Sequence, residues 1–179
     1  MKVSVVLPLV LVLGAFAIAA QAGEGKNEAR KDSGKRTGLE RIKQLAGEWV
    51  GKEIEGGKEG NEVHVKYKVT SHGSAVVETL FPDTEHEMVT VIHQDGDDLV
   101  LTHYCALGNQ PQMRAAGKGD GNQVAFKFTH ATNLKSEKDM HMHDVTFTFV
   151  AKDKLKAEWT NYNHGKPAGK VVFELKRKK

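Results

Sequence analysis

Apolar and polar residues alternate in short runs along most of the chain, from Leu45 onward. Gly, Asn, Asp and Pro separate these runs, which is typical of strands joined by turns. The spacing predicts ten strands, at 47–53, 62–70, 74–81, 87–94, 99–105, 112–117, 123–130, 142–150, 154–161 and 170–177. One helix is expected over 38–46, because Leu39, Ile42 and Leu45 fall on one helix face.

The connections between the predicted strands differ at the two ends of a simple meander. One end has compact turns, such as 71–73, 95–98 and 152–153, whereas the other end has longer connections, at 56–61, 82–86, 106–111, 131–141 and 162–169. We therefore expect an all-β fold, an antiparallel up-and-down β-barrel of about ten strands, with a mouth at the loop-rich end. The short N-terminal helix would plug the opposite end.

Polar side chains share the inward face of several predicted strands near this mouth. His103 and Cys105 lie two residues apart late in one strand, so both point to its apolar face. His141 and His143 have the same spacing at the start of another strand. Two further residues, at the ends of their strands, complete the predicted ligand-binding group, which is His103, Cys105, His130, His141, His143 and Asn161.

A cluster of this composition has several explanations. Buried polar groups need partners, and imidazole and thiolate bind zinc, copper or iron, so we predict His103, His141 and His143 as metal ligands. Alternatively, His103 is a hydrogen-bonded core histidine and His130 makes a local bond at a strand end. His141 and His143 would then lie in a solvated segment. The aromatic side chains in phase with them are expected to fill the barrel, namely Tyr67, Phe126, Phe128, Phe147 and Trp159.

The N-terminal residues predict export. Lys2 precedes an apolar run at 5–19, and Ala20-Gln21-Ala22 matches a cleavage site, so 1–22 is a predicted signal peptide. Residues 23–38 are polar and small, which predicts a disordered linker, and 39–179 form the expected barrel domain. The expected location is periplasmic or extracellular. The apolar run is short for a membrane span, so no integral membrane segment is expected after cleavage.

Charge and cysteine content narrow the partners. The chain has 26 basic and 23 acidic residues, a formal charge of +3, which does not indicate nucleic-acid binding. Cys105 is the one cysteine, so an intrachain disulfide is excluded.

Short motifs resemble the lipocalin-like, or calycin, superfamily. A short helix followed by Gly47-Glu48-Trp49 matches its Gly-x-Trp opening, and Arg177 or Lys176 matches the basic residue late in its last strand. The resemblance implies that Trp49 closes the barrel base and that Arg177 covers its indole ring, with Gly47, Trp49 and Arg177 in structural roles.

Two groups within this superfamily carry a closer likeness. The segment 86–111 looks like a set of exported, uncharacterised bacterial lipocalin-like domains. The number of strands is similar to that of nitrobindin-type barrels, which hold haem through a histidine near the C-terminus. His164 lies in the loop before the last predicted strand. Haem or a transition metal is therefore a candidate cofactor.

Three functions fit these observations. The first is a secreted lipocalin-like protein that binds a small molecule in a His- and Cys-lined pocket. The second is a barrel enzyme that uses histidine acid–base chemistry with Cys105 as nucleophile. The third is an envelope structural or interaction module with a filled core.

Overall fold

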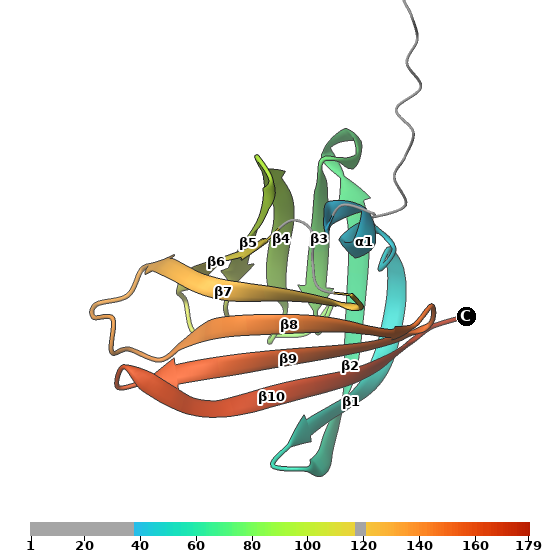
Figure 1. Cartoon of the computed structure of the whole chain (residues 1–179). Coiled ribbons are helices and arrows are strands. Elements are labelled where there is room, and N and C mark those ends of the chain that lie inside the picture. The colour runs from blue at the N-terminus through green and yellow to red at the C-terminus, as the bar shows by residue number, and fades with distance from the viewer. Residues whose placement is uncertain (1–37, 117–120) are drawn as a thin grey trace, which may run out of the picture. The chain divides into compact units, whose positions relative to one another are not determined.

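The computed structural model describes residues 38–116 and 121–179 (Figure 1). The predicted signal peptide and the predicted linker, apart from residue 38, lie outside the described residues. The elements follow in the order α1 (Gly38–Lys43), β1 (Gly47–Glu55), β2 (Lys58–Thr70), η1 (Ser71–Gly73), β3 (Ala75–Leu80), β4 (Met88–Asp95), β5 (Asp98–Tyr104), β6 (Gln110–Ala116), β7 (Gln123–Thr132), β8 (His141–Ala151), β9 (Lys154–Asn163) and β10 (Lys166–Arg177).

Each strand pairs antiparallel with the next one along the chain, and β1 pairs with β10 to close a barrel. Burial along the strands has a period of two. In β2, for example, Val63, Val65 and Tyr67 are buried and the residues between them are exposed. This alternation places one face of the sheet inside the barrel. The predicted all-β, ten-stranded, up-and-down barrel is confirmed.

The helix is shorter than the spacing predicts, but its apolar face has the predicted role. α1 ends at Lys43, and the chain continues through a tight turn in which Gln44 N donates to Arg41 O at 3.1 Å. Leu39, Ile42 and Leu45 are all buried in the barrel core, and α1 contacts β3, β4 and β5.

Two connections that were expected to be long are tight hairpins instead. Gly56 and Gly57 alone join β1 to β2, with φ of 57° and 80°, and His164 and Gly165 join β9 to β10, with φ of 54° and 75°. Positive φ at both positions suits two-residue hairpin turns. The prediction of loops at 56–61 and 162–169 is therefore wrong. The strands that follow these hairpins, β2 and β10, each begin with five exposed residues, so no apolar stripe marks these two strand starts in the sequence.

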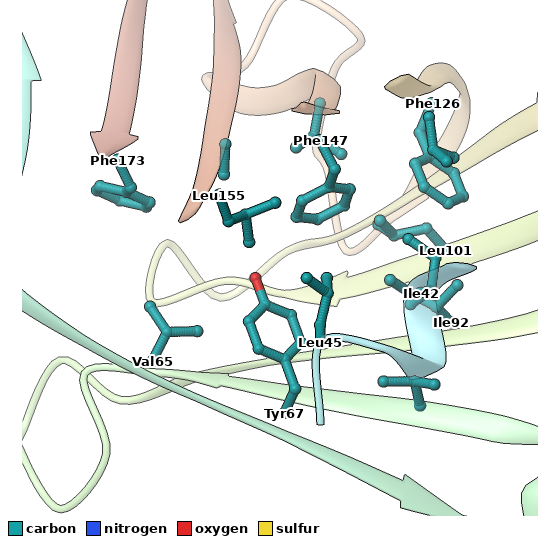
Figure 2. Close-up of a cluster of buried hydrophobic side chains, with 14 of the residues drawn as sticks. Ile42, Leu45, Val65, Tyr67, Ile92, Leu101, Phe126, Phe147, Leu155 and Phe173 are labelled. Carbon is teal, nitrogen blue, oxygen red and sulfur yellow. The ribbon is translucent and has the colours of Figure 1, made fainter. Parts of the chain in front are cut away.

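The core consists of aliphatic and aromatic side chains, several of which Figure 2 shows converging from facing strands. Phe126 and Phe147 meet edge to face with ring centroids 6.1 Å apart, and Phe81 meets Phe173 in the same way at 6.0 Å. Such pairs add to the burial of apolar surface. Among the described residues, no helix is both long and apolar enough to cross a membrane.

Candidate functional site

One end of the barrel is closed by the residues of the Gly-x-Trp motif. Trp49 is buried and donates its indole N–H to Leu45 O at 2.7 Å. The Arg177 guanidinium lies 4.4 Å from the centre of the indole ring and donates to the main-chain oxygens of Ala46 and Gln44, both at 2.6 Å. A cation held over the indole by two carbonyls has a structural role. This is the contact that the motif implies.

A row of four buried polar residues crosses the inner face of β2, β3, β4 and β5. Tyr67 is directly opposite Glu78, Glu78 is opposite Thr90, and Thr90 is opposite His103. We call these four residues the polar row. Tyr67 Oη donates to Glu78 Oε1 at 2.6 Å, and Thr90 Oγ1 is bonded to His103 Nδ1 at 2.9 Å. All four side chains are at least 98 % buried.

Burial shifts the pKa values within the polar row. It raises the pKa of Glu78, against the hydrogen bond from Tyr67, which lowers it, and the second carboxyl oxygen, Oε2, is buried without a partner among the described residues. It also raises the pKa of Tyr67, to which the charge of Glu78 adds. Burial lowers the pKa of His103 to about 4, so its ring is neutral at physiological pH.

His103 lies against Trp159 from the far wall, with ring centroids 4.8 Å apart. In the described part of the chain, His103 Nε2 and Trp159 Nε1 are both buried without a hydrogen-bond partner, and so is Oδ1 of Asn161, two residues further along β9. An unpaired buried polar atom costs about 1–3 kcal/mol. Three of them on neighbouring or contacting side chains are the arrangement expected where a polar ligand binds.

His141 and His143 belong to a separate aromatic group, the mouth stack, with Phe128 and Tyr162. The His143 ring is stacked between two aromatic rings, with its centroid 3.6 Å from that of Tyr162 and 4.5 Å from that of Phe128. His141 Nδ1 donates to a main-chain carbonyl, that of Asp139, at 2.8 Å, so in the neutral ring its Nε2 accepts from His143 Nδ1 at 3.1 Å. Burial lowers the pKa of His143, and nearby Asp144 opposes this.

Cys105 lies just beyond β5, at the start of a tight turn rather than in the strand. Its main-chain N–H donates to Asn109 O at 3.1 Å, and its carbonyl accepts from Gly108 N at 2.9 Å. Burial raises the pKa of the Cys105 thiol, so the less nucleophilic protonated form prevails at neutral pH. Asn109 is itself buried and donates to Met140 O at 2.9 Å, which ties this turn to the loop before β8.

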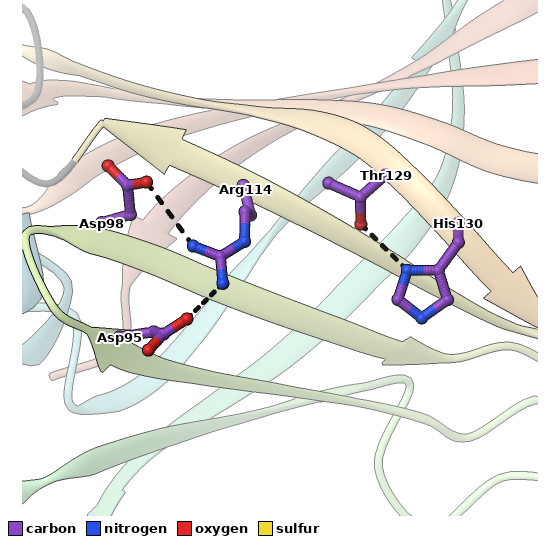
Figure 3. Close-up of polar contacts among 5 residues, drawn as sticks. All are labelled: Asp95, Asp98, Arg114, Thr129 and His130. Carbon is purple, nitrogen blue, oxygen red and sulfur yellow. Dashed lines mark hydrogen bonds and ion pairs between the residues drawn. The ribbon is translucent and has the colours of Figure 1, made fainter.

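His130 lies outside these groups. It is exposed on β7 and contacts the neighbouring Thr129, as Figure 3 shows. Gln112 of β6 is opposite His130, but the next residue, Met113, is opposite Phe128, so Thr129 is an extra residue. A β-bulge of this kind reverses which face the following residues occupy. The predicted inward position of His130 is therefore not observed.

Figure 3 also shows Arg114 of β6 paired with Asp95 and Asp98 across the neighbouring turn. These three side chains are exposed, so they contribute little to stability and nothing to the interior.

Within residues 38–116 and 121–179, no group of three or more His, Cys, Asp or Glu residues is arranged to hold a metal ion. His141 and His143 bond to each other, whereas His103 bonds to Thr90. The three predicted metal ligands thus belong to two different sets of contacts.

A separate groove of about 890 Å³ lies on the barrel wall and is lined mainly by residues of β1, β2 and the β3–β4 connection. None of the six predicted site residues lines it. Five acidic residues make its lining acidic, namely Glu48, Glu53, Glu62, Asp83 and Glu87. Lys66 and Lys178 offset part of that charge. The groove and the interior site are therefore formed by different residues.

Sequence reasoning missed Glu78 and Thr90. Glu78 alternates with the buried Val76 and Leu80, and Thr90 alternates with the buried Ile92. The criterion that found His103, a polar residue in phase with an apolar stripe, applies equally to both of them. Their significance depends on the register of β2 to β5, which places them in one row with His103.

The class of protein that the fold defines is the antiparallel β-barrel. Among solved structures, the chain is similar to Rv2717c from M. tuberculosis, with a TM-score of 0.58 and 12% identity over 79% of this chain and 98% of that one. It is also similar to a protein of unknown function from the DUF3598 family of Nostoc punctiforme, with a TM-score of 0.51 and 13% identity over 76% of this chain.

The chain spans 48% of the Nostoc protein. At these identities the likeness shows the fold alone. No family model and no curated protein matches the chain.

Proposed function

We propose that this chain is an exported, lipocalin-like protein that binds one small molecule inside its barrel. The ligand's polar head contacts His103, Trp159 and Asn161, and its body packs against the apolar interior. Export rests on the predicted signal peptide at 1–22.

The observation that carries this proposal is the set of unpaired buried atoms. His103 and Trp159 are 1% and 2% exposed, and each has a ring nitrogen with no partner among the described residues. Native interiors satisfy nearly all buried polar groups. A bound molecule with complementary atoms removes both penalties, and a barrel of this strand number can enclose one small ligand.

The enzyme alternative receives no comparable support. Cys105 is the one sulfur nucleophile of the chain, and burial raises the pKa of its thiol. Its main-chain hydrogen bonds are those of a turn. Binding therefore explains the unpaired atoms more directly than catalysis through this cysteine does.

The test is to purify the protein from the compartment of its native host to which it is exported. Denatured extracts are analysed by mass spectrometry, and the intact protein by absorption spectroscopy and metal analysis. We expect a small molecule in near-stoichiometric amount. A Soret band would identify this molecule as haem, and an extract free of small molecules would contradict the proposal.

A matched pair of variants connects the ligand to the site. In His103→Asn the side-chain amide, which can donate or accept, takes the place of Nδ1 in the bond to Thr90, but nothing replaces Nε2. His93→Asn changes an exposed histidine of β4. The first variant should lose most of the bound molecule and the second should retain it. Equal retention in both would show that the molecule binds elsewhere.

A further inference from the structure

A second cavity, of about 790 Å³, lies at the closed end of the barrel. It is formed where α1, the turn that follows it, the hairpin between β8 and β9 and the end of β10 come together. None of the residues of the proposed ligand site lines it. None of its described lining residues is acidic, and five are basic, which we call the basal cations: Arg41, Lys43, Lys152, Lys154 and Arg177.

The two arginines are held in place by groups that carry no net charge. Arg177 lies over the indole ring of Trp49 and donates to two main-chain oxygens. The Arg41 guanidinium lies 4.9 Å from the centre of the Phe149 ring and donates to the main-chain oxygen of Gly121. Neither arginine forms an ion pair with an acid in the described part of the chain. Both therefore bring an uncompensated positive charge to the cavity.

The three lysines add to this charge. Lys152 and Lys154 are exposed at the β8–β9 hairpin, and within residues 38–116 and 121–179 neither has an acidic partner. Lys43 is paired with Glu40, with 2.5 Å between Nζ and Oε1. The other four basal cations have no such partner among the described acids. The cavity therefore concentrates positive charge in a chain whose formal charge is only +3.

This concentration of charge favours an anion in the cavity. Like charges around one cavity repel each other, and the repulsion is stronger where protein replaces water. A singly charged anion offsets the charge of one cation, so an anion with two or more charges is the better fit. A phosphate group concentrates its charge and several acceptor oxygens on one centre, and cations from three elements can contact it from several sides. Arginine and lysine are the residues that bind phosphate best.

The surroundings of the cavity favour a small anion over an anionic membrane surface. Three exposed acids, Glu40, Glu48 and Asp153, adjoin its lining residues in sequence but do not line it. A flat anionic bilayer at this end would approach these carboxylates and be repelled by them. A small anion inside the cavity contacts the lining residues and avoids the acids.

We propose that this cavity binds a small soluble anion that carries a phosphate group with at least two negative charges, and that the basal cations are the residues that bind it. The cavity shares no residue with the proposed site at His103, so neither proposal depends on the other.

Calorimetric titration of the protein near neutral pH, in a buffer free of phosphate and sulfate, tests the ligand class. The probes are inorganic pyrophosphate, malonate and acetate. We expect saturable binding of pyrophosphate that weakens as salt is added, because salt screens exposed charges. Malonate, which spreads its charge over two carboxylates, should bind more weakly than pyrophosphate. Acetate, with one charge, should bind at least about tenfold more weakly.

Two double variants with the same change in net charge locate the site. Lys152→Gln/Lys154→Gln removes two basal cations whose side chains form no hydrogen bond or ion pair with a described residue, so its melting temperature should stay near that of the wild type. Lys58→Gln/Lys170→Gln removes two exposed lysines outside the cavity. We expect the first variant to bind pyrophosphate about tenfold more weakly and the second to bind it as the wild type does.

Three results would overturn the proposal. One is equal affinity for pyrophosphate in both double variants, or no binding at concentrations up to about 10 mM. Another is malonate binding as tightly as pyrophosphate, which would refute a phosphate ligand. The third is sedimentation of the wild type, but not of Lys152→Gln/Lys154→Gln, with phosphatidylglycerol vesicles in the absence of pyrophosphate binding. That result would assign the basal cations to a membrane surface instead.

Discussion

Replacing Tyr67 with Phe tests the buried carboxylate of the polar row. The change removes one hydroxyl and leaves the ring, so the Glu78 carboxylate loses the 2.6 Å bond from Tyr67 while packing stays nearly the same. Hydrogen bonds to charged groups contribute about 1.5–3 kcal/mol, and those between neutral groups about 0.5–1.5 kcal/mol. We expect a loss of about 2 kcal/mol near neutral pH.

The pH dependence of this loss has a definite sign. Burial raises the pKa of Glu78, and the bond from Tyr67 counteracts that rise. Without the bond the folded-state pKa is higher still, so the folded variant binds a proton over a wider pH range. An acid with a raised folded-state pKa favours folding below its unfolded value and loses that contribution as pH rises through the folded value. The destabilisation by Tyr67→Phe must therefore grow as pH rises through the folded-state pKa of Glu78, which burial raises above the reference value of 4.5.

Urea unfolding measures both quantities. The free energy of unfolding typically falls by about 2 kcal/mol per molar urea. A loss of about 2 kcal/mol therefore lowers the urea midpoint by about 1 M near neutral pH. A loss of about 1 kcal/mol near pH 4 lowers it by half as much. Tyr104→Phe, on the exposed face of β5, is the control and should change stability by less than about 0.5 kcal/mol. A loss that is negligible at both pH values, or that shrinks as pH rises, would refute this account of Glu78.

Three further predictions concern stability. Folding lowers the pKa of His103 from 6.5 to about 4. As pH drops between these values, the free energy of unfolding of the wild type, measured with urea, should therefore fall by about 3 kcal/mol relative to that of His103→Asn. A difference between the two proteins that does not change with pH would contradict the buried neutral ring. Arg177→Met should cost about 2 kcal/mol through loss of the indole contact and two carbonyl bonds, whereas Lys176→Met should be nearly neutral in thermal melts. A Cβ on Gly51 would lie 1.9 Å from a main-chain oxygen of β10, so Gly51→Ala should lower the melting temperature sharply, whereas Gly60→Ala, with ordinary contacts at 3.5 Å, should not.

Much of the fold follows from the sequence because the barrel has one buried face. The period-two alternation locates the strands, and the resemblance of the Gly-x-Trp opening implies the contact between Arg177 and Trp49 that the structure contains. The two hairpins are missed because β2 and β10 begin with residues that are exposed on both faces and form no apolar stripe.

The site is only partly predictable, for two physical reasons. His103 is found because a single polar residue interrupts an apolar face, but its partners in the row depend on strand register, which alternation within one strand does not encode. His130 is misplaced because Thr129 forms a bulge, and a bulge reverses the facing of later residues without a signal in the hydrophobic pattern.

The central claim is that the unpaired atoms of His103 and Trp159 hold a ligand. A crystal structure of the protein purified from its native host tests this most directly. We expect electron density for a non-protein molecule within hydrogen-bond distance of both His103 Nε2 and Trp159 Nε1. Finding these two atoms bonded to protein groups, or packed against side chains with no molecule between them, would contradict it.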